Sequence, residues 1–359
     1  MKSIYKITFL LFLFPLITSA RIDEKKHEKK KTIKKEYNVN ADAKVSINNK
    51  YGNLNITTWD KNSVEIEVTI TVKGDDLESV KDKLAAISVT FNASTSLVTA
   101  TTYFEKQQRS WSFWNNNSTT NYQINYNVKM PKSNSVNLNN DYGSIFVDYL
   151  DGKADINCDY GKISIGELTA DYNNINIDYC NSSTIGYMKS GNINADYSKI
   201  TIDKSDDLNV NADYSTLKFG TVKKIDFNAD YGSISIDEAT QVNGNSDYVS
   251  MNFGTIKKNL NIDSDYGSLS IKKLAKDFEN VTIDSKYAGI RIGVESDAVF
   301  NFEIDLQYAG FNGANDKMEF NKKISKSTKK YYEGKFGKGN STSKLKIRSQ
   351  YGGVSITEY

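Results

Sequence analysis

The sequence predicts an all-β protein built as a parallel β-solenoid with coils of 17–21 residues, right-handed winding and a small α+β N-terminal cap. Two observations support this fold class. A short motif returns at nearly constant spacing, as in INADYSKITID (193–203), VNADYSTLKFG (210–220) and NADYGSISID (228–237). Inside each copy, apolar and polar residues alternate, and β-branched residues fill many apolar positions, which is typical of strands. The preference for right-handed crossovers gives the winding.

The period is set by a tyrosine in each repeat. The tyrosines are Tyr142, Tyr160, Tyr179, Tyr197, Tyr214, Tyr231, Tyr248, Tyr266, Tyr287, Tyr308 and Tyr351. Tyr51 is an outlying member nearer the N-terminus. A fixed period over so many copies is the signature of stacked repeats, because one such unit cannot bury its apolar face alone.

The alternation predicts where the tyrosines point. In LNVNADY (208–214), the apolar residues and Tyr214 share one side, and the Asn and Asp residues share the other. Parallel pairing about 4.8 Å apart would then form a tyrosine ladder inside the rod. Offset-stacked rings would contribute about 0.5–1.5 kcal/mol per pair beyond burial.

Small residues flank the tyrosine. Two positions before it stand Cys158, Ala195, Ala212, Ala229, Ser246, Ser264 and Ser285, which would leave room for the rings. The next residue after it is usually Gly, Ser or Ala, but Val249 also occurs there. Valine does not tolerate a left-handed backbone, so that position requires small size at a corner rather than a positive φ.

A column of carboxylates is expected on the outer face. Aspartate directly precedes the tyrosine at Asp141, Asp159, Asp178, Asp196, Asp213, Asp230, Asp247 and Asp265. Carboxylates stacked about 5 Å apart repel by about 1 kcal/mol per neighbour even in water. Three interpretations stay open: a solvated, hydrogen-bonded Asn/Asp face, a weak cation face that could take Ca²⁺, or a ligand-binding face. No other cofactor is expected.

The N-terminus carries an expected export signal. Residues 1–20 combine early lysines, an apolar run too short for a comfortable membrane span, and small residues suited to cleavage. Residues 21–36 are rich in lysine and predict a solvated linker, or alternatively a basic arm that touches acidic surface polymers. No later segment is predicted to span a membrane. The expected location is the periplasm, the cell surface or the medium.

Two regions interrupt the repeats. Residues 37–130 predict the β-rich cap, with a short helix at about 75–86 where apolar residues have helical spacing. Residues 131–359 predict the solenoid, with a projecting loop at about 312–342. Within the cap, Trp111, Phe113 and Trp114 stand in a polar loop. They either cover the cap or form a sugar- or partner-binding platform.

Catalysis has little support in the sequence. The only histidine, His27, lies in the lysine-rich segment, so histidine-dependent triads are not expected in the folded body. Arg291 is the one basic candidate for a polysaccharide-active site, beside repeats that lack the aspartate. The two cysteines, Cys158 and Cys180, are expected to remain free because strand geometry separates them by about 10 Å. The formal net charge of +2 gives no field for nucleic acid.

The segment INYNVKMPKSNSVNLNNDYGSIFVDYLDGKADINCDYGKISIGEL (124–168) resembles the bacterial putative-adhesin β-strand-repeat proteins, a domain of unknown function. Related repeats form the head domains of putative autotransporter adhesins. The resemblance covers roughly residues 37–359 and includes the YNVKMPK lead-in at 126–132. It implies a β-solenoid in an exported envelope protein and transfers no catalytic motif. We therefore expect a non-enzymatic, adhesin-like or envelope-scaffold protein whose partners are envelope or surface proteins or glycans. The alternative is a carbohydrate-binding or carbohydrate-active β-helix.

Overall fold

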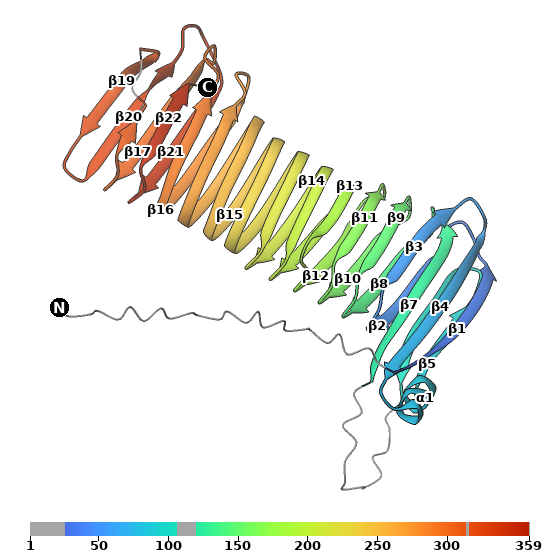
Figure 1. Ribbon diagram of the computed structural model, residues 1–359. Helices are drawn as coiled ribbons and strands as arrows, with labels where there is room; N and C mark the ends of the chain where they lie inside the picture. Colours follow the sequence, from blue (N-terminus) through green and yellow to red (C-terminus); the bar gives the residue numbers. More distant parts are fainter. Residues whose placement is uncertain (1–25, 106–119, 314–315, 359) are drawn as a thin grey trace, which may run out of the picture.

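The computed structural model describes residues 26–105, 120–313 and 316–358. These residues are almost entirely β-strand, so the all-β prediction is confirmed. Figure 1 shows the strands stacked side by side along one axis, with β1 and α1 near one end and β19 and β20 at the other.

The first strands form the end that carries the helix. They are β1 (His27–Asn38), β2 (Lys44–Lys50), β3 (Leu54–Trp59), β4 (Ser63–Gly74), β5 (Ile87–Ala93), β6 (Leu97–Phe104) and β7 (Asn121–Pro131). The helix α1 (Leu77–Ala85) lies within the range predicted for it. The Asp76 side chain begins the helix by accepting a hydrogen bond of 2.7 Å from the Ser79 amide, and Val80 is its buried residue.

The remaining strands form the body and the far end of the stack. The body contains β8 (Ser135–Asp141), β9 (Ile145–Leu150), β10 (Ala154–Asp159), β11 (Ile163–Leu168), β12 (Asn173–Asp178), β13 (Ser183–Asp196), β14 (Lys199–Asp213), β15 (Thr216–Leu274) and β16 (Asn280–Val294). The far end contains β17 (Phe300–Gln307), β18 (Phe311–Asn312), β19 (Met318–Ser325), β20 (Lys329–Phe336), β21 (Lys344–Gln350) and β22 (Val354–Glu358).

Each repeat adds one layer, defined here as the strand before a repeat tyrosine together with the strand after it. Neighbouring layers pair in parallel, with equivalent residues opposite one another: Asn194 pairs with Asn211, and Asp196 pairs with Asp213. This register places each kind of side chain in a column along the stack. The core lies between the two faces, where residues such as Leu208, Val210 and Phe219 are at most 2% exposed.

The two ends are closed by antiparallel strands. At the N-terminal end, β4 lies between β1 and β7, and β5 pairs with β6. Residues 27–36, predicted to be part of a solvated linker, form most of β1 instead, paired with β4 from His27 to Asn38. Its exposed lysines suit an edge strand, because like charges discourage pairing with another chain.

The far end departs from the order of the sequence. Strand β21 lies between β16 and β17, and β22 lies between β16 and β18. The segment 312–342, predicted to project as a loop, contains the hairpin β19–β20 instead. Strand β20 pairs with β17 over its whole length, so the hairpin extends the stack.

Candidate functional site: the tyrosine ladder

The repeat tyrosines have an unusual backbone conformation. All twelve, including Tyr51, have φ between 48° and 62°, in the left-handed region. This conformation costs about 1–2 kcal/mol for an L-residue. The corner is held by backbone hydrogen bonds between layers: the Tyr197 amide donates to the Asp213 carbonyl at 3.0 Å, and the amides of Tyr160, Tyr179 and Tyr214 donate to the equivalent aspartates.

The left-handed corner turns the rings outward. Around Tyr214, Ala212 points inward, Asp213 and Tyr214 both point outward, and Ser215 points inward. The ladder tyrosines are accordingly 37–53% exposed. The prediction that the rings line the interior was therefore wrong. Strict alternation does not continue through a residue with positive φ.

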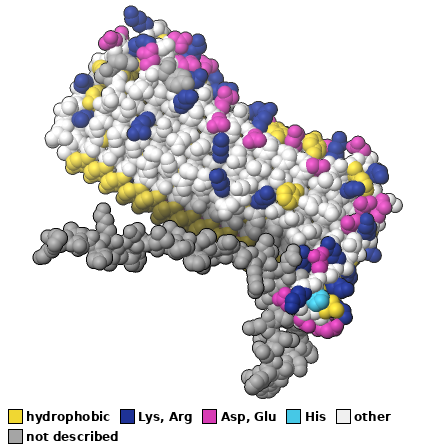
Figure 2. All heavy atoms as spheres, viewed as in Figure 1, with side chains coloured by type: hydrophobic (Ala, Val, Ile, Leu, Met, Phe, Trp, Pro, Cys, Tyr) yellow, Lys and Arg dark blue, Asp and Glu magenta, His cyan; other side chains and the backbone are white. Residues whose placement is uncertain are grey.

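The rings nevertheless form one continuous stack. Consecutive ring centroids are 4.7–5.1 Å apart, with interplanar angles of 0–7°. The order is Tyr51, Tyr142, Tyr160, Tyr179, Tyr197, Tyr214, Tyr231, Tyr248, Tyr266, Tyr287, Tyr351 and Tyr308. Figure 2 shows the corresponding hydrophobic stripe along one edge of the molecule. We call this edge the ladder corner.

The close packing inside the ladder corner explains why small residues flank the tyrosines in the sequence. A Cβ on Gly161 would lie 2.0 Å from the Gly143 carbonyl oxygen, so the layers approach too closely there for most side chains. Neither glycine has a positive φ, which agrees with the predicted requirement for small size. The small residues two positions before the tyrosine, such as Ala212, are buried inside the corner. They do not make room for the rings, which lie outside.

The predicted aspartate column runs beside the ladder. Lys50 pairs with Asp141 at 2.7 Å at one end, and Lys286 pairs with Asp265 at 3.2 Å at the other. Between them, Asp159, Asp178, Asp196, Asp213, Asp230 and Asp247 have no ion-pair partner among the described residues. Partial burial, and then the neighbouring carboxylates, raise the pKa of Asp159, Asp178 and Asp213.

Asparagines two positions before these aspartates form a second column, in which the side chains hydrogen-bond to one another. The Asn157 amide donates to Asn139 Oδ1 at 2.7 Å, and the Asn176 and Asn194 amides continue the series at 2.6 Å each. These bonds agree with the hydrogen-bonded interpretation of that column. In the described ranges, no group of three or more His, Cys, Asp or Glu side chains is arranged to hold a metal ion. The weak Ca²⁺ affinity suggested for the aspartates stays a prediction.

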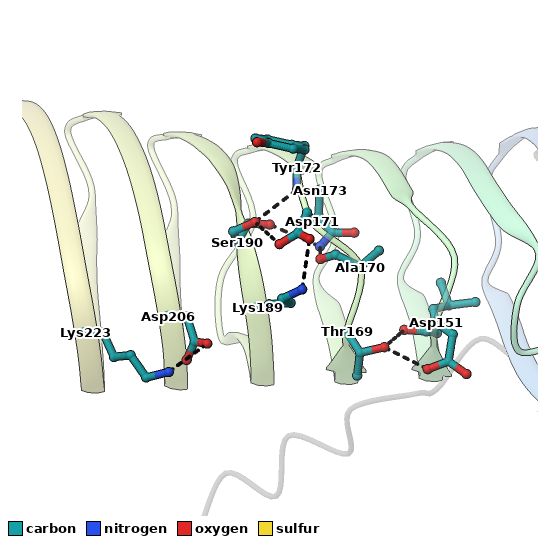
Figure 3. A network of polar contacts seen from close by, with 11 residues as sticks. Asp151, Thr169, Ala170, Asp171, Tyr172, Asn173, Lys189, Ser190, Asp206 and Lys223 are labelled. Atoms are coloured by element: carbon teal, nitrogen blue, oxygen red, sulfur yellow. Dashed lines mark hydrogen bonds and ion pairs between the residues drawn. The ribbon is translucent and has the colours of Figure 1, made fainter.

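Each layer has a second corner, where the chain turns back toward the next ladder corner. The charged side chains there are arranged differently. Lysines pair with acids of the adjacent layer there, including Lys189 with Asp171 at 2.8 Å and Lys223 with Asp206 at 2.9 Å (Figure 3). Similar pairs join Lys257 to Glu238 at 2.6 Å and Lys276 to Asp297 at 3.0 Å. The charges of the second corner are thus largely compensated, unlike those of the ladder corner.

Arg291 lies on the face that follows the ladder corner. It is exposed and lines a hollow of about 580 Å³ together with residues such as Ser270, Phe311 and Ser355. None of the lining residues is acidic, so no carboxylate stands beside Arg291 in the hollow. A second hollow of about 480 Å³ lies on the asparagine-bearing face, over Phe227 and Gly244.

The remaining predicted residues fall into two groups. Cys158 and Cys180 are free, as predicted, and both are buried. The expected separation was wrong, however, because Cys180 Sγ donates to the Cys158 carbonyl at 3.1 Å. The hydrogen bond between the two thiols, together with burial, raises the pKa of Cys158 well above its usual range. Trp111, Phe113 and Trp114 lie outside the described residues.

Sequence reasoning missed the outward turn of the tyrosines, although the sequence marks the position of the bend. Leu208, Val210 and Ala212 occupy even positions, whereas Leu217 and Phe219 after the tyrosine occupy odd ones. This change of phase indicates a bend at or next to Tyr214.

Within the described ranges, no helix combines the length and apolar character that crossing a bilayer requires.

The chain matches no family model, and no match was found among curated proteins. It is similar to solved structures described as a putative adhesin from Bacteroides fragilis, at 10% identity, and a putative adhesin from Parabacteroides distasonis, at 12%. Each likeness covers 91% of this chain and 97% of the other, with a TM-score of 0.32. A putative cell adhesion protein from Clostridium sporogenes is 10% identical over 92% of this chain and 100% of the other, with a TM-score of 0.18. These descriptions agree with the family that the sequence resembles. The TM-scores are too low to support an argument about function, which rests on the geometry.

Proposed function

We propose that this protein is an exported, adhesin-like interaction protein whose contact surface is the ladder corner. One observation carries the proposal: twelve stacked tyrosines, each 37–53% exposed, form a continuous stripe on one edge of the molecule. Contiguous aromatic surface of this extent usually marks an interaction site. The stacked layers, which we take to be a right-handed β-solenoid with coils of 17–21 residues, act as a stiff support that spaces the rings.

The proposal assigns no enzymatic activity. The hollow at Arg291 is lined by no carboxylate, and hydrolysis of a glycosidic bond generally needs a pair of them. The carbohydrate-binding alternative is not favoured either. Sugars stack on the faces of aromatic rings, whereas each interior ring of the ladder has both faces covered by its neighbours at about 5 Å, as for Tyr197.

Two measurements test the proposal. Cells that produce the protein are fractionated and treated with an external protease, and we expect the protein to be cleaved at the surface. Purified wild-type protein and the triple variant Tyr179→Asn, Tyr197→Asn, Tyr214→Asn are then immobilised, and retention of cells under flow is compared.

We expect the wild type to retain cells and the variant to lose most of this retention. Asparagine keeps the left-handed corner accessible while removing the rings. Full protection from the protease would contradict surface adhesion and favour the scaffold role inside the envelope. Equal retention by the two proteins would exclude the ladder as the contact surface.

A further inference from the structure

The ladder corner combines two features that are separate elsewhere on the molecule. One is the exposed stripe of ring edges, and the other is the parallel column of aspartates, of which six have no cation partner among the described residues. The second corner also carries acids, but lysines such as Lys189 and Lys223 neutralise them. A file of aspartates in successive layers without a cation partner therefore lies beside the rings.

From this combination we propose that the ladder corner binds an extended, lysine- or arginine-rich polypeptide segment that lies along the stack. The inference rests on the proposed function and names its partner class. Lysine and arginine side chains pair a hydrocarbon stem with a terminal cation. The stems can cover the exposed edges of rings such as Tyr197 while the cations reach carboxylates such as Asp196 and Asp213.

Other partner classes fit this surface less well. An anionic polymer would be repelled by the aspartates, and a sugar would find the ring faces covered. The whole chain has a formal net charge of +2, so a polycation is not attracted by the protein in general. Its binding would have to come from the local column of aspartates.

The dimensions allow an extended chain. Eight aspartates in register span about 34 Å at a layer spacing of about 4.8 Å. Roughly ten extended residues cover this length. A polyproline II segment repeats its side-chain direction every three residues, or about 9.3 Å, which is close to two layers. A lysine at every third position could therefore meet every second aspartate.

The inference is tested by fluorescence anisotropy with a labelled peptide of ten lysines as the probe and a peptide of ten glutamates as the control. The test variant carries Asp178→Asn, Asp196→Asn, Asp213→Asn and Asp230→Asn. The matched variant carries Asp171→Asn, Asp206→Asn, Asp207→Asn and Asp277→Asn, which makes the same charge change away from the ladder corner. Circular dichroism melting verifies that both variants are folded.

We expect the wild type and the matched variant to bind the lysine peptide similarly, and the test variant to bind it roughly tenfold more weakly, as the loss of several exposed ion pairs would give. Binding should also weaken with added salt. Equal loss in both variants, or no loss in the test variant, would overturn the inference. So would self-association of the protein through the ladder corner in place of peptide binding.

The peptide assay is independent of where the protein resides. If the lysine peptide does not bind but cell retention still depends on the rings, the partner class is wrong and the proposed function stands. If the peptide binds at the ladder corner and the cells are not retained, the surface is a polycation site and the adhesin-like function is wrong.

Discussion

The ladder tyrosine combines an unfavourable backbone with favourable side-chain contacts. Each interior ring, such as Tyr197, stacks on two neighbours, and each stacked pair contributes about 0.5–1.5 kcal/mol. That gain is similar in size to the cost of the left-handed backbone, about 1–2 kcal/mol. Ring stacking therefore offsets the cost of a conformation that the backbone hydrogen bonds between layers also hold.

Substitution of Tyr197 separates the two contributions. Every replacement loses the same two ring contacts, but Gly and Asn accept a positive φ more readily than Ala, and Val accepts it least. We expect Tyr197→Gly and Tyr197→Asn to be less destabilising than Tyr197→Ala by about 0.5–1 kcal/mol, with Tyr197→Val the worst. Urea unfolding measures the free energy of unfolding of each variant. A valine variant more stable than the glycine variant would contradict the role of the backbone.

The aspartate column predicts a pH dependence with an uncommon sign. The pKa values of Asp159, Asp178 and Asp213 are raised in the folded state by burial and by neighbouring carboxylates. Folded protein therefore binds protons more tightly than unfolded protein, and these groups reduce stability as the pH rises above the ordinary value of 3.8.

Replacing these three aspartates by asparagine should therefore raise Tm at pH 7 by roughly 1–3 °C. The difference should vanish near pH 3, which is below the ordinary value of 3.8. Asp171→Asn is the control of opposite sign, because its hydrogen bond to Lys189 lowers the pKa of Asp171. A triple variant that is less stable than the wild type at pH 7 would contradict this prediction. It would show that other groups stabilise the charged aspartates in the folded protein.

At the scale of the element, the period and register could be predicted from the sequence, whereas the direction of the corner could not. Alternation identifies the strands, and equal spacing makes equivalent residues pair, as Asn194 and Asn211 do. Alternation does not encode the sign of φ, so Tyr214 was assigned to the inside with Ala212. Residues 27–36 were missed because their pairing with β4 depends on an edge far along the chain and not on an apolar pattern of their own.

Two glycines of similar appearance in the sequence should respond differently to substitution. In Gly161→Ala, the new Cβ would lie 2.0 Å from the Gly143 carbonyl oxygen of the adjacent layer, so the layers must separate. We expect a loss of roughly 1–3 kcal/mol, typical of overpacking. Gly289→Ala is the matched control, because its Cβ would meet nothing within 4 Å. Equal urea midpoints for the two variants would contradict the close approach at the ladder corner.

At the scale of the whole molecule, the stack is closed by strands that do not follow the order of the repeats. The layer of β21 and β22 separates β16 from β17 and β18. Its Tyr351 is the ring between Tyr287 and Tyr308, at 4.7 Å and 4.9 Å. The long interval before Tyr351 showed an interruption in the sequence, but the place where that layer inserts depends on contacts between distant strands.

Removal of residues 343–359 tests this arrangement. The deletion takes away the layer that joins the unit of β17, β19 and β20 to the rest of the stack. We expect limited proteolysis to cut the truncated protein between 295 and 342 while the layers before residue 280 stay intact. Wild-type protein treated in parallel should resist. Equal resistance of residues 295–342 in both proteins would mean that this unit docks without the inserted layer.

The inserted layer also constrains the order in which the molecule can assemble. Most of the stack can grow as successive repeats leave the ribosome, since each layer rests on the one before it. The strand at 300–307 must wait, because its parallel neighbour at 344–350 is synthesised after it, and the strand at 329–336 pairs with that waiting strand. A vacant slot therefore persists until the final strands arrive, and during that interval the open edge of β16 is the point at which a foreign strand could join the growing chain.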